Sequence, residues 1–500
     1  MSLIGVSGLT YSYEGSYDNV FENVTLNLDT DWRLGLIGRN GKGKTTFLRL
    51  LTGELDDGGA ISAKTEFEYF PYEIRDKSLT GIEIAYELCP DCEYWQIVRE
   101  LSLLEVDDEV LSRSFDSLSG GEQTKLMLAL LFLRPERFLL IDEPTNHLDA
   151  RARETVGRYL SRKKGFILVS HDRTLLDRCC DHILSINRTT IELTAGNYSV
   201  WDENRRRREQ FELAENERLL SDIKRLEKAA KRTADWSDKA ESKKIGFDPT
   251  KVEKSLDRRA VQGRKAQKMM DRAKAISKRR QDAVEEKSRL LKDLETAQEL
   301  KISPLAYRSA RLAQFEDISL FYGENRVCSG VGFAVERGER TVLSGRNGCG
   351  KSSLLRLLCG EDIKYTGTLT KPGDLVISYV PQDTSFLCGS LDDFAAERGI
   401  DISLFKAILR KLGFSREQFS KDMSDFSAGQ KKKTLIAASL SERAHLYIWD
   451  EPLNYIDLFS REQIEQLICR FAPTMLLVEH DSRFCEIIGA KEIEIKNEEQ

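Results

Sequence analysis

The sequence lacks the features that mark membrane and secreted proteins. No window of its 500 residues approaches the roughly 18 uninterrupted apolar residues that span a bilayer, and its start, MSLIGVSGLT, lacks the basic and apolar regions of a signal peptide. The ten cysteines are scattered, apart from the neighbours Cys179 and Cys180 and a lone CPDC containing Cys89 and Cys92. We therefore expect a cytoplasmic protein with reduced, unligated thiols and, at this length, several globular domains.

Two stretches carry the same phosphate-binding pattern, GRNGKGKT at residues 38–45 and GRNGCGKS at residues 345–352. Each follows an apolar strand-like run and precedes an amphipathic helical pattern, which is the context that the motif requires. The residues expected to bind ATP here are Gly38, Arg39, Asn40, Gly41, Lys42, Gly43, Lys44, Thr45 and Thr46 in the first half and Gly345, Arg346, Asn347, Gly348, Cys349, Gly350, Lys351, Ser352 and Ser353 in the second.

Two apolar runs, FLLIDEP and LYIWDEP, each end in a pair of carboxylates. In an ATPase the first carboxylate, Asp142 or Asp450, binds Mg²⁺ with the loop hydroxyl of Thr45 or Ser352. The second carboxylate is expected to be catalytic, because it can polarise the attacking water; these are Glu143 and Glu451. The spacings from loop lysine to this carboxylate, and from it to the histidine of VSHD or VEHD, differ by one residue between the halves. One α/β domain of about 200 residues is therefore used twice.

SLSGGEQTK and DFSAGQKKK, which lie before the carboxylates, resemble the signature of ATP-binding-cassette (ABC) ATPases. The resemblance implies two cassettes that close head to tail, so that the signature of each half faces the phosphate loop of the other across ATP. It also implies tyrosines that stack on adenine and catalytic histidines that sense the γ phosphate. The residues that it adds are Ser119, Gly120, Gly121, Ser427, Ala428 and Gly429 in the signatures, the tyrosines Tyr13 and Tyr322, and the histidines His171 and His480.

The halves differ at several positions of this pattern. Cassette ATPases usually carry a glutamine that can touch Mg²⁺ and the attacking water; the second half has Gln382 in YVPQD, whereas the first has Tyr72 in YFPYE. Ala428 replaces a signature glycine, and EPLNYID stands against EPTNHLD. We expect two unequal sites, neither of them inactive.

Residues 201–300 form a basic segment, with 28 Lys and Arg against 21 Asp and Glu, although the whole chain has a net charge of −6. Helical spacing of Leu219, Ile223, Leu226 and Ala230, and a seven-residue spacing of Met269, Ile276, Ala283 and Leu290, predict two long helices paired antiparallel. The positive charge is densest over residues 231–280, near Trp236 and Phe247, which favours contact with RNA over a solvated spacer.

The expected domains are therefore a first ABC ATPase domain at 1–200, a helical hairpin linker at 201–304 with its tip at about 236–262, and a second ATPase domain at 305–500. The stretch WSDKAESKKIGFDPTKVEK, with Gly246 and Pro249 as breakers, is expected to form the turn. Its Lys243, Lys244 and Phe247 are the candidates for contact with the ribosome.

This arrangement resembles the ABC-F family, which acts on ribosomes, and most closely its antibiotic-resistance branch of Lsa-like and Vga-like proteins. The resemblance rests on the long linker, on EPLNYID and on YEGSYDNVFENVTLNLDTDWRLGLIGRNGKGKTTF near the start. It implies a monomeric ATPase that uses ATP and Mg²⁺. In the ATP-bound form it would enter the tRNA exit site of the 70S ribosome, contact large-subunit rRNA and peptidyl-site tRNA, and dislodge lincosamide, streptogramin A or pleuromutilin antibiotics.

Two other functions stay open on the sequence. A housekeeping ABC-F translation factor would share the cassettes and the linker, although the short segment between Tyr72 and Ser117 leaves no room for the inserted arm of such factors. The ATPase subunit of an antibiotic exporter would share the cassettes but give the basic linker no role.

Overall fold

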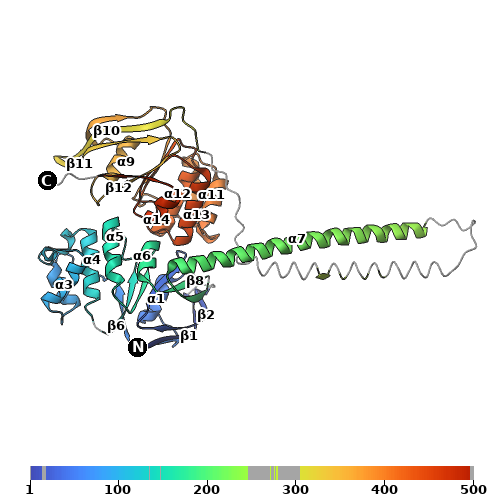
Figure 1. Ribbon diagram of the computed structural model, residues 1–500, viewed down its shortest axis with the longest axis horizontal. Helices are drawn as coiled ribbons and strands as arrows, with labels where there is room; N and C mark the ends of the chain where they lie inside the picture. The colour runs from blue at the N-terminus through green and yellow to red at the C-terminus, as the bar shows by residue number, and fades with distance from the viewer. Residues whose placement is uncertain are drawn as a thin grey trace, which may run out of the picture. The chain divides into compact units, whose positions relative to one another are not determined.

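The computed structural model describes residues 2–13, 19–134, 136–146, 148–187, 189–245 and 304–495, with five helical positions between 268 and 279. It divides into two compact units, Met1–Trp201 with Glu299–Gln500, and Asp202–Gln298. The first unit contains two cassettes of the same design, drawn blue to teal and yellow to red in Figure 1. The expectation of tandem α/β nucleotide-binding domains is confirmed.

The first cassette contains two sheets. The smaller is antiparallel, with β1 (Leu3–Tyr11) between β2 (Phe21–Asp29) and β4 (Ile61–Ser62). The larger has the order β5-β6-β7-β3-β8-β9 and is parallel except for the pair β8–β9. Its strands are β3 (Arg33–Gly38), β5 (Glu66–Phe70), β6 (Arg137–Asp142), β7 (Phe166–Val169), β8 (His182–Asn187) and β9 (Thr190–Ala195). The helices are α1 (Lys44–Thr52), α2 (Gly81–Leu88), α3 (Tyr94–Leu103), α4 (Gly120–Leu131), α5 (Ala150–Leu160) and α6 (Arg173–Cys179).

The second cassette repeats this plan. Its antiparallel sheet contains β10 (Arg311–Tyr322) between β11 (Asn325–Glu336) and β13 (Lys364–Thr370). Its parallel sheet has the order β14-β15-β16-β12-β17, with strands β12 (Arg340–Ser344), β14 (Ile377–Val380), β15 (Leu446–Asp450), β16 (Met475–Val478) and β17 (Lys491–Glu494). The helices are α9 (Lys351–Cys359), α10 (Leu391–Glu397), α11 (Ile402–Lys411), α12 (Ala428–Ser441), α13 (Leu458–Phe471) and α14 (Ser482–Ile487).

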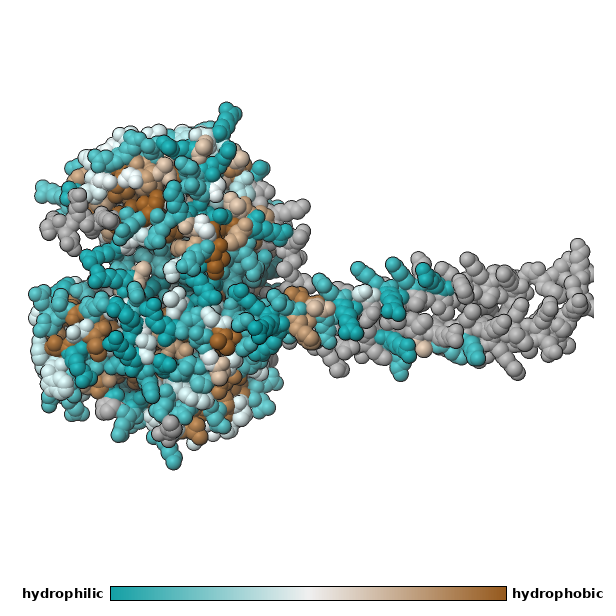
Figure 2. Space-filling view, viewed as in Figure 1, coloured by the Kyte–Doolittle hydropathy of each residue, from teal (hydrophilic) through white to brown (hydrophobic). Residues whose placement is uncertain are grey.

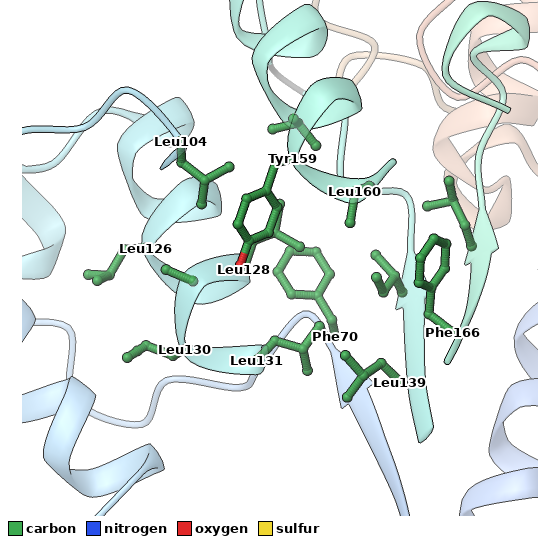
Figure 3. Close-up of a cluster of buried hydrophobic side chains, with 14 of the residues drawn as sticks. Phe70, Leu104, Leu126, Leu128, Leu130, Leu131, Leu139, Tyr159, Leu160 and Phe166 are labelled. Carbon is green, nitrogen blue, oxygen red and sulfur yellow. The ribbon is translucent and has the colours of Figure 1, made fainter. Parts of the chain in front are cut away.

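Each parallel sheet is buried on both faces. In the first cassette, Leu36, Leu140 and Ile167 face the antiparallel sheet, in one core cluster with Ile4 and Phe21. On the opposite face, residues of the same strands pack on the helices, and Figure 3 shows Phe70 and Tyr159 among the leucines of this second cluster. Because both faces are covered, these strands read as continuous apolar runs.

The linker begins with one long helix, α7 (Tyr198–Ile245), of 48 residues. At 1.5 Å per residue it is roughly 70 Å long. Its first turn belongs to the first cassette, because Tyr198 and Trp201 are buried in that core; the second compact unit starts at Asp202.

The turn assigned to residues 236–254 is wrong in its first half. Residues 236–245 are helical, since they contain neither glycine nor proline, and α7 ends at Ile245, just before Gly246. Lys243 and Lys244 therefore belong to the last turn of α7. Phe247 and the apolar stripe from Met269 to Leu290 lie outside the described residues, so the second arm stays a prediction.

The prediction that all ten cysteines are free thiols is also wrong. Cys89 and Cys92 form a disulfide with a Cα–Cα distance of 5.5 Å, because the turn between α2 and α3 brings their backbones within bonding range. The other eight cysteines are free.

The visible surface is mostly hydrophilic, with small separate hydrophobic patches on the described residues (Figure 2). Within the described part of the chain, no helix is both long enough and apolar enough to span a membrane.

Candidate functional site

Both phosphate loops connect a buried strand to a helix through a left-handed glycine. Gly43 and Gly350, the N-caps of α1 and α9, have φ angles of 93° and 91°. A Cβ on Gly43 would lie 2.6 Å from Val20, so only glycine fits there. The loop lysines fold onto their own loops: Lys44 Nζ donates to Gly38 O at 2.9 Å, and Lys351 Nζ to Gly345 O at 2.8 Å. The loops are thus built to present amides and one ammonium group to phosphate.

An oxygen pair suited to Mg²⁺ lies beside each loop. Thr45 Oγ1 donates to Asp142 Oδ2 at 3.2 Å, and Ser352 Oγ donates to Asp450 Oδ1 at 3.0 Å. Burial raises the pKa of both carboxyl groups, that of Asp450 to about 6. A hydroxyl and a carboxylate are hard oxygen ligands, and a bound cation would offset the cost of burying these carboxylates. The residues therefore fit the expected ion.

The two expected adenine tyrosines hold matching positions. Tyr13 OH lies 2.7 Å from Thr46 Oγ1, and Tyr322 OH lies 3.0 Å from Ser353 Oγ. Their side chains are about half exposed. Each ring is therefore attached to the first turn of its phosphate-loop helix and keeps an accessible surface.

The expected catalytic glutamates adopt the left-handed backbone region, with φ of 50° at Glu143 and 45° at Glu451. This conformation is uncommon for residues other than glycine and clusters at functional sites. Glu143 Oε1 lies 3.2 Å from His171 Nε2. Burial, followed by the charge of Asp142, raises the pKa of Glu143 to about 8, and burial lowers the pKa of His171 well below its usual value. Both shifts disfavour the charged form of the side chain in the nucleotide-free chain.

The second glutamate has different partners. Gln382 Nε2 donates to Glu451 Oε2 at 2.8 Å, and Asn454 Nδ2 donates to the same oxygen at 2.6 Å. His480 Nε2 is buried without a hydrogen-bond partner among the described residues, and burial lowers the pKa of His480 to about 4. A neutral ring nitrogen left in this state is available to a ligand.

The first cassette cannot reproduce the glutamine contact. Tyr72, at the position of Gln382, packs against the helical core of its own cassette, with the guanidinium carbon of Arg134 5.7 Å from its ring centre. Arg134 is in turn paired with Glu68 at 2.7 Å. The tyrosine is thereby used for packing, and the two sites differ in the groups that orient their glutamates.

The second phosphate loop and the first signature line one cavity of about 1270 Å³. The cavity contains Ser119, Gly120 and Gly121 from the first cassette, and Lys351, Ser352, Tyr322, Gln382, Glu451 and His480 from the second. These residues are far apart in sequence, and the structure assembles them into one composite site. A cavity of this kind can hold a nucleotide between a phosphate loop and a signature helix.

The first phosphate loop meets the second signature by direct contact. Asn40 Nδ2 donates to Tyr455 O at 2.6 Å, and a Cβ on Gly429 would lie 2.8 Å from Asn40 Nδ2 and 2.5 Å from Tyr455 O. Any side chain at position 429 would therefore clash with Asn40 and with the backbone of Tyr455, so this position requires glycine. Ala428 is the first helical residue of α12, so the missing glycine leaves the backbone unstrained.

Each signature begins a helix through a capping box, Ser119 with Glu122 at α4 and Ser427 with Gln430 at α12. The serine and the third helical residue satisfy each other's backbone N–H groups, which fixes the helix start. The partial positive charge of that helix end then faces the nucleotide position.

A buried ion pair links the cassettes beside the first site. Arg173 Nη1 of α6 lies 2.8 Å from Glu465 Oε1 of α13, and both side chains are nearly inaccessible. We expect Arg173→Met to cost about 3–5 kcal/mol, because it leaves Glu465 buried without its countercharge. The thermal unfolding midpoint should fall accordingly. The double variant Arg173→Met, Glu465→Leu should recover much of the loss, and an equal loss in both variants would contradict this account.

Sequence reasoning missed Lys432, Lys433 and Asp457, which lie at the two sites. Lys432 Nζ donates to the backbone oxygen of Asp450, at the end of β15. Lys433 Nζ donates to Asp457 Oδ2. The signal was present in the run of three lysines of DFSAGQKKK, where the first signature has one. A charged run usually lies on a solvated face, and here it does not.

Comparison with known proteins agrees with this geometry. A family model described as ABC transporter matches residues 21–146 and 328–454, half of the chain. A ribosome protection protein of Bacillus subtilis, VmlR, is 29% identical over 496 residues, 97% of this chain and 86% of its own length. The ATP-binding protein Uup of Caulobacter vibrioides is 27% identical, covering 95% of this chain and 74% of its own.

Solved structures share the fold at lower identity. A chain in the crystal structure of an archaeal ribosomal stalk protein with the ribosome recycling factor aABCE1 superposes with a TM-score of 0.62 at 19% identity. The superposition covers 98% of this chain and 88% of the other. At this identity the likeness describes the fold alone.

Proposed function

Because this chain belongs to the ABC transporter family of ATPases, and within it to the tandem-cassette ABC-F group, we propose that it is a cytoplasmic ribosome protection protein. The observation that carries the proposal is the combination of two composite nucleotide sites with a basic interdomain segment that begins with a 48-residue helix. Similarity to a ribosome protection protein over 97% of the chain supports it.

The chain is an ATPase, and we assign the steps of hydrolysis to its own residues. The phosphate loops hold the nucleotide through their amides and through Lys44 and Lys351. Glu143 and Glu451 accept the proton of the attacking water, and His171 and His480 contact the terminal phosphate. Thr45 and Asp142 in the first site, and Ser352, Gln382 and Asp450 in the second, would hold Mg²⁺, which when bound would neutralise charge at the phosphates.

The opposing signatures make hydrolysis depend on closure. Ser119, Gly120 and Gly121 line the cavity of Lys351, and we assign them to that site. Ser427, Ala428 and Gly429 would complete the site of Lys44, where Gly429 lies against Asn40. ATP interacts with both cassettes only when they are closed, so it shifts the population toward the closed state. Hydrolysis removes the bridging phosphate and reopens the cassettes.

We assign the closed state to ribosome binding. Its basic linker would contact large-subunit rRNA and the peptidyl-site tRNA from the exit site, because phosphates attract its lysines and arginines. Lys243, Lys244 and Phe247 at the expected tip are the first candidates for these contacts. Displacement near the peptidyl transferase centre would then release a bound lincosamide, streptogramin A or pleuromutilin.

Expression in a susceptible host tests the resistance role. We expect higher inhibitory concentrations for at least one of the three drug classes, and no protection from a Lys44→Ala, Lys351→Ala control that cannot hold ATP phosphates. Unchanged inhibitory concentrations for all three classes would exclude resistance and favour a housekeeping ABC-F role instead.

A further inference from the structure

Two neighbouring lysines in α12, Lys432 and Lys433, are buried although they follow an exposed signature. Their exposed fractions are 2% and 5%. A buried ammonium group is costly unless it is hydrogen-bonded and has negative charge nearby. Both lysines meet this condition, but each does so through a different set of partners.

Lys432 joins the two chain segments that carry Gln382 and Glu451. Its Nζ donates to Pro381 O and to Asp450 O, both at 2.9 Å. Each carbonyl belongs to the residue just before one of the two side chains, and those side chains bond each other at 2.8 Å. Lys432 thus hydrogen-bonds to both backbone segments that carry the Gln382–Glu451 hydrogen bond and holds them at a fixed distance.

The first cassette has no such tie at the corresponding position. Thr124 takes the place of Lys432 in the signature alignment, and its Oγ1 donates to Gly120 O of its own helix at 2.8 Å. The same cassette has Tyr72 in place of the glutamine. The buried lysine and the glutamine that it positions therefore occur together in one half of the chain and are both replaced in the other.

Lys433 is connected to the first site instead. Its Nζ donates to Leu412 O at 2.9 Å and to Asp457 Oδ2 at 2.6 Å. Asp457 caps α13 by accepting from Ser460 N at 3.0 Å, and it ends the loop in which Tyr455 O accepts from Asn40 Nδ2. Asn40 Oδ1 in turn accepts from Lys44 Nζ at 3.2 Å, so the path ends at the first phosphate loop.

We propose that Lys432 is a positioning residue for the second nucleotide site and Lys433 a positioning residue for the first. One helix then orients the hydrolytic groups of its own cassette and the loop that closes on the other cassette. The inference rests on the proposed roles of Glu143 and Glu451 in hydrolysis and does not depend on ribosome binding.

Site-resolved trapping of nucleotide tests this on the intact chain without ribosomes. The chain is labelled with 8-azido-ATP in the presence of Mg²⁺, with and without vanadate, and the labelled peptides of each cassette are quantified. We expect Lys432→Met to reduce vanadate-dependent label at the second cassette about 10- to 100-fold relative to the first, since misplaced catalytic groups slow turnover by this order. Lys433→Met should shift the ratio in the opposite direction.

Label without vanadate should change less than about threefold, because neither lysine touches the nucleotide in this proposal. Lys432→Thr, the residue of the first cassette, is the second variant and should behave as Lys432→Met does. Glu451→Gln provides the reference for lost trapping at the second cassette. A ratio that stays within twofold of the original chain, or equal loss of label at both cassettes in all three lysine variants, would overturn the proposal.

Discussion

The Glu143→Gln, Glu451→Gln double variant is expected to lose ATP turnover by roughly 100- to 10,000-fold and to co-sediment with ribosomes when ATP is present. Glutamine has nearly the shape of glutamate, and its amide can retain a hydrogen bond to Gln382 or His171. It cannot accept the proton of the attacking water. The variant should therefore keep ATP bound and stay closed.

The first site is especially suited to this substitution. Burial raises the pKa of Glu143 to about 8 in the nucleotide-free chain, so this position tolerates a neutral side chain. Glutamine keeps the size of the glutamate side chain and should leave the contact between Asn40 and Tyr455 intact. Closure should be retained while chemistry is lost.

Ultracentrifugation through a sucrose cushion provides the measurement. The double variant should pellet with ribosomes in ATP and remain in the supernatant without nucleotide. A Lys44→Ala, Lys351→Ala control should stay in the supernatant under both conditions. A double variant that fails to pellet in ATP, although it retains bound nucleotide, would exclude the ribosomal role and favour the exporter subunit as the alternative.

Shortening the linker within residues 241–256 is expected to abolish drug resistance while basal ATPase activity stays within about twofold. The segment includes the end of α7 at Ile245. Each helical residue removed shortens an arm by about 1.5 Å. A deletion of several residues therefore moves the tip back by more than the distance over which two atoms are in contact. The described cores of the cassettes are built from residues 4–201 and 312–495, so we expect the cassettes to fold without this segment.

The measurements are inhibitory concentrations in a susceptible host and phosphate release by the purified chain. A matched variant, Lys243→Ala, Lys244→Ala and Phe247→Ala, keeps the length and removes the charge and the ring. If this variant protects and the shortened chain does not, resistance depends on the length of the linker. If neither protects, resistance depends on the side chains of Lys243, Lys244 and Phe247. Full resistance in the shortened chain would contradict a working role for the tip, and loss of both activities would indicate damaged cassettes.

Local sequence patterns were sufficient for the elements that carry the sites. The phosphate loops, the carboxylates at the ends of β6 and β15 and the capped signature helices are each specified within about ten residues. Glycine conformation, strand hydrophobicity and helix capping are short-range effects, so they are visible in the sequence. The sequence predicts the linker helix for the same reason, but α7 continues to Ile245, beyond the predicted start of the turn at Trp236, because no glycine or proline interrupts it before Gly246.

Partners that lie far apart in sequence were not predictable in this way. Nothing local indicates that Lys432 bonds Pro381 or that Tyr72 packs against Arg134. The disulfide between Cys89 and Cys92 joins near neighbours, and it was missed for a different reason. Charged runs are usually solvated and CPDC pairs are usually free in a reduced compartment, so the ordinary expectation failed at these positions.

The sequence by itself determined two α/β cassettes, their phosphate loops and carboxylates, and a basic helical segment between them. Only the tertiary structure decided how the two sites differ, because that difference depends on contacts such as Asn40 with Tyr455, 415 residues apart, and on which buried lysine faces which site. Hydrophobic periodicity and glycine conformation act between near neighbours, whereas the placement of a buried charge depends on the side chains and backbone carbonyls that folding brings around it.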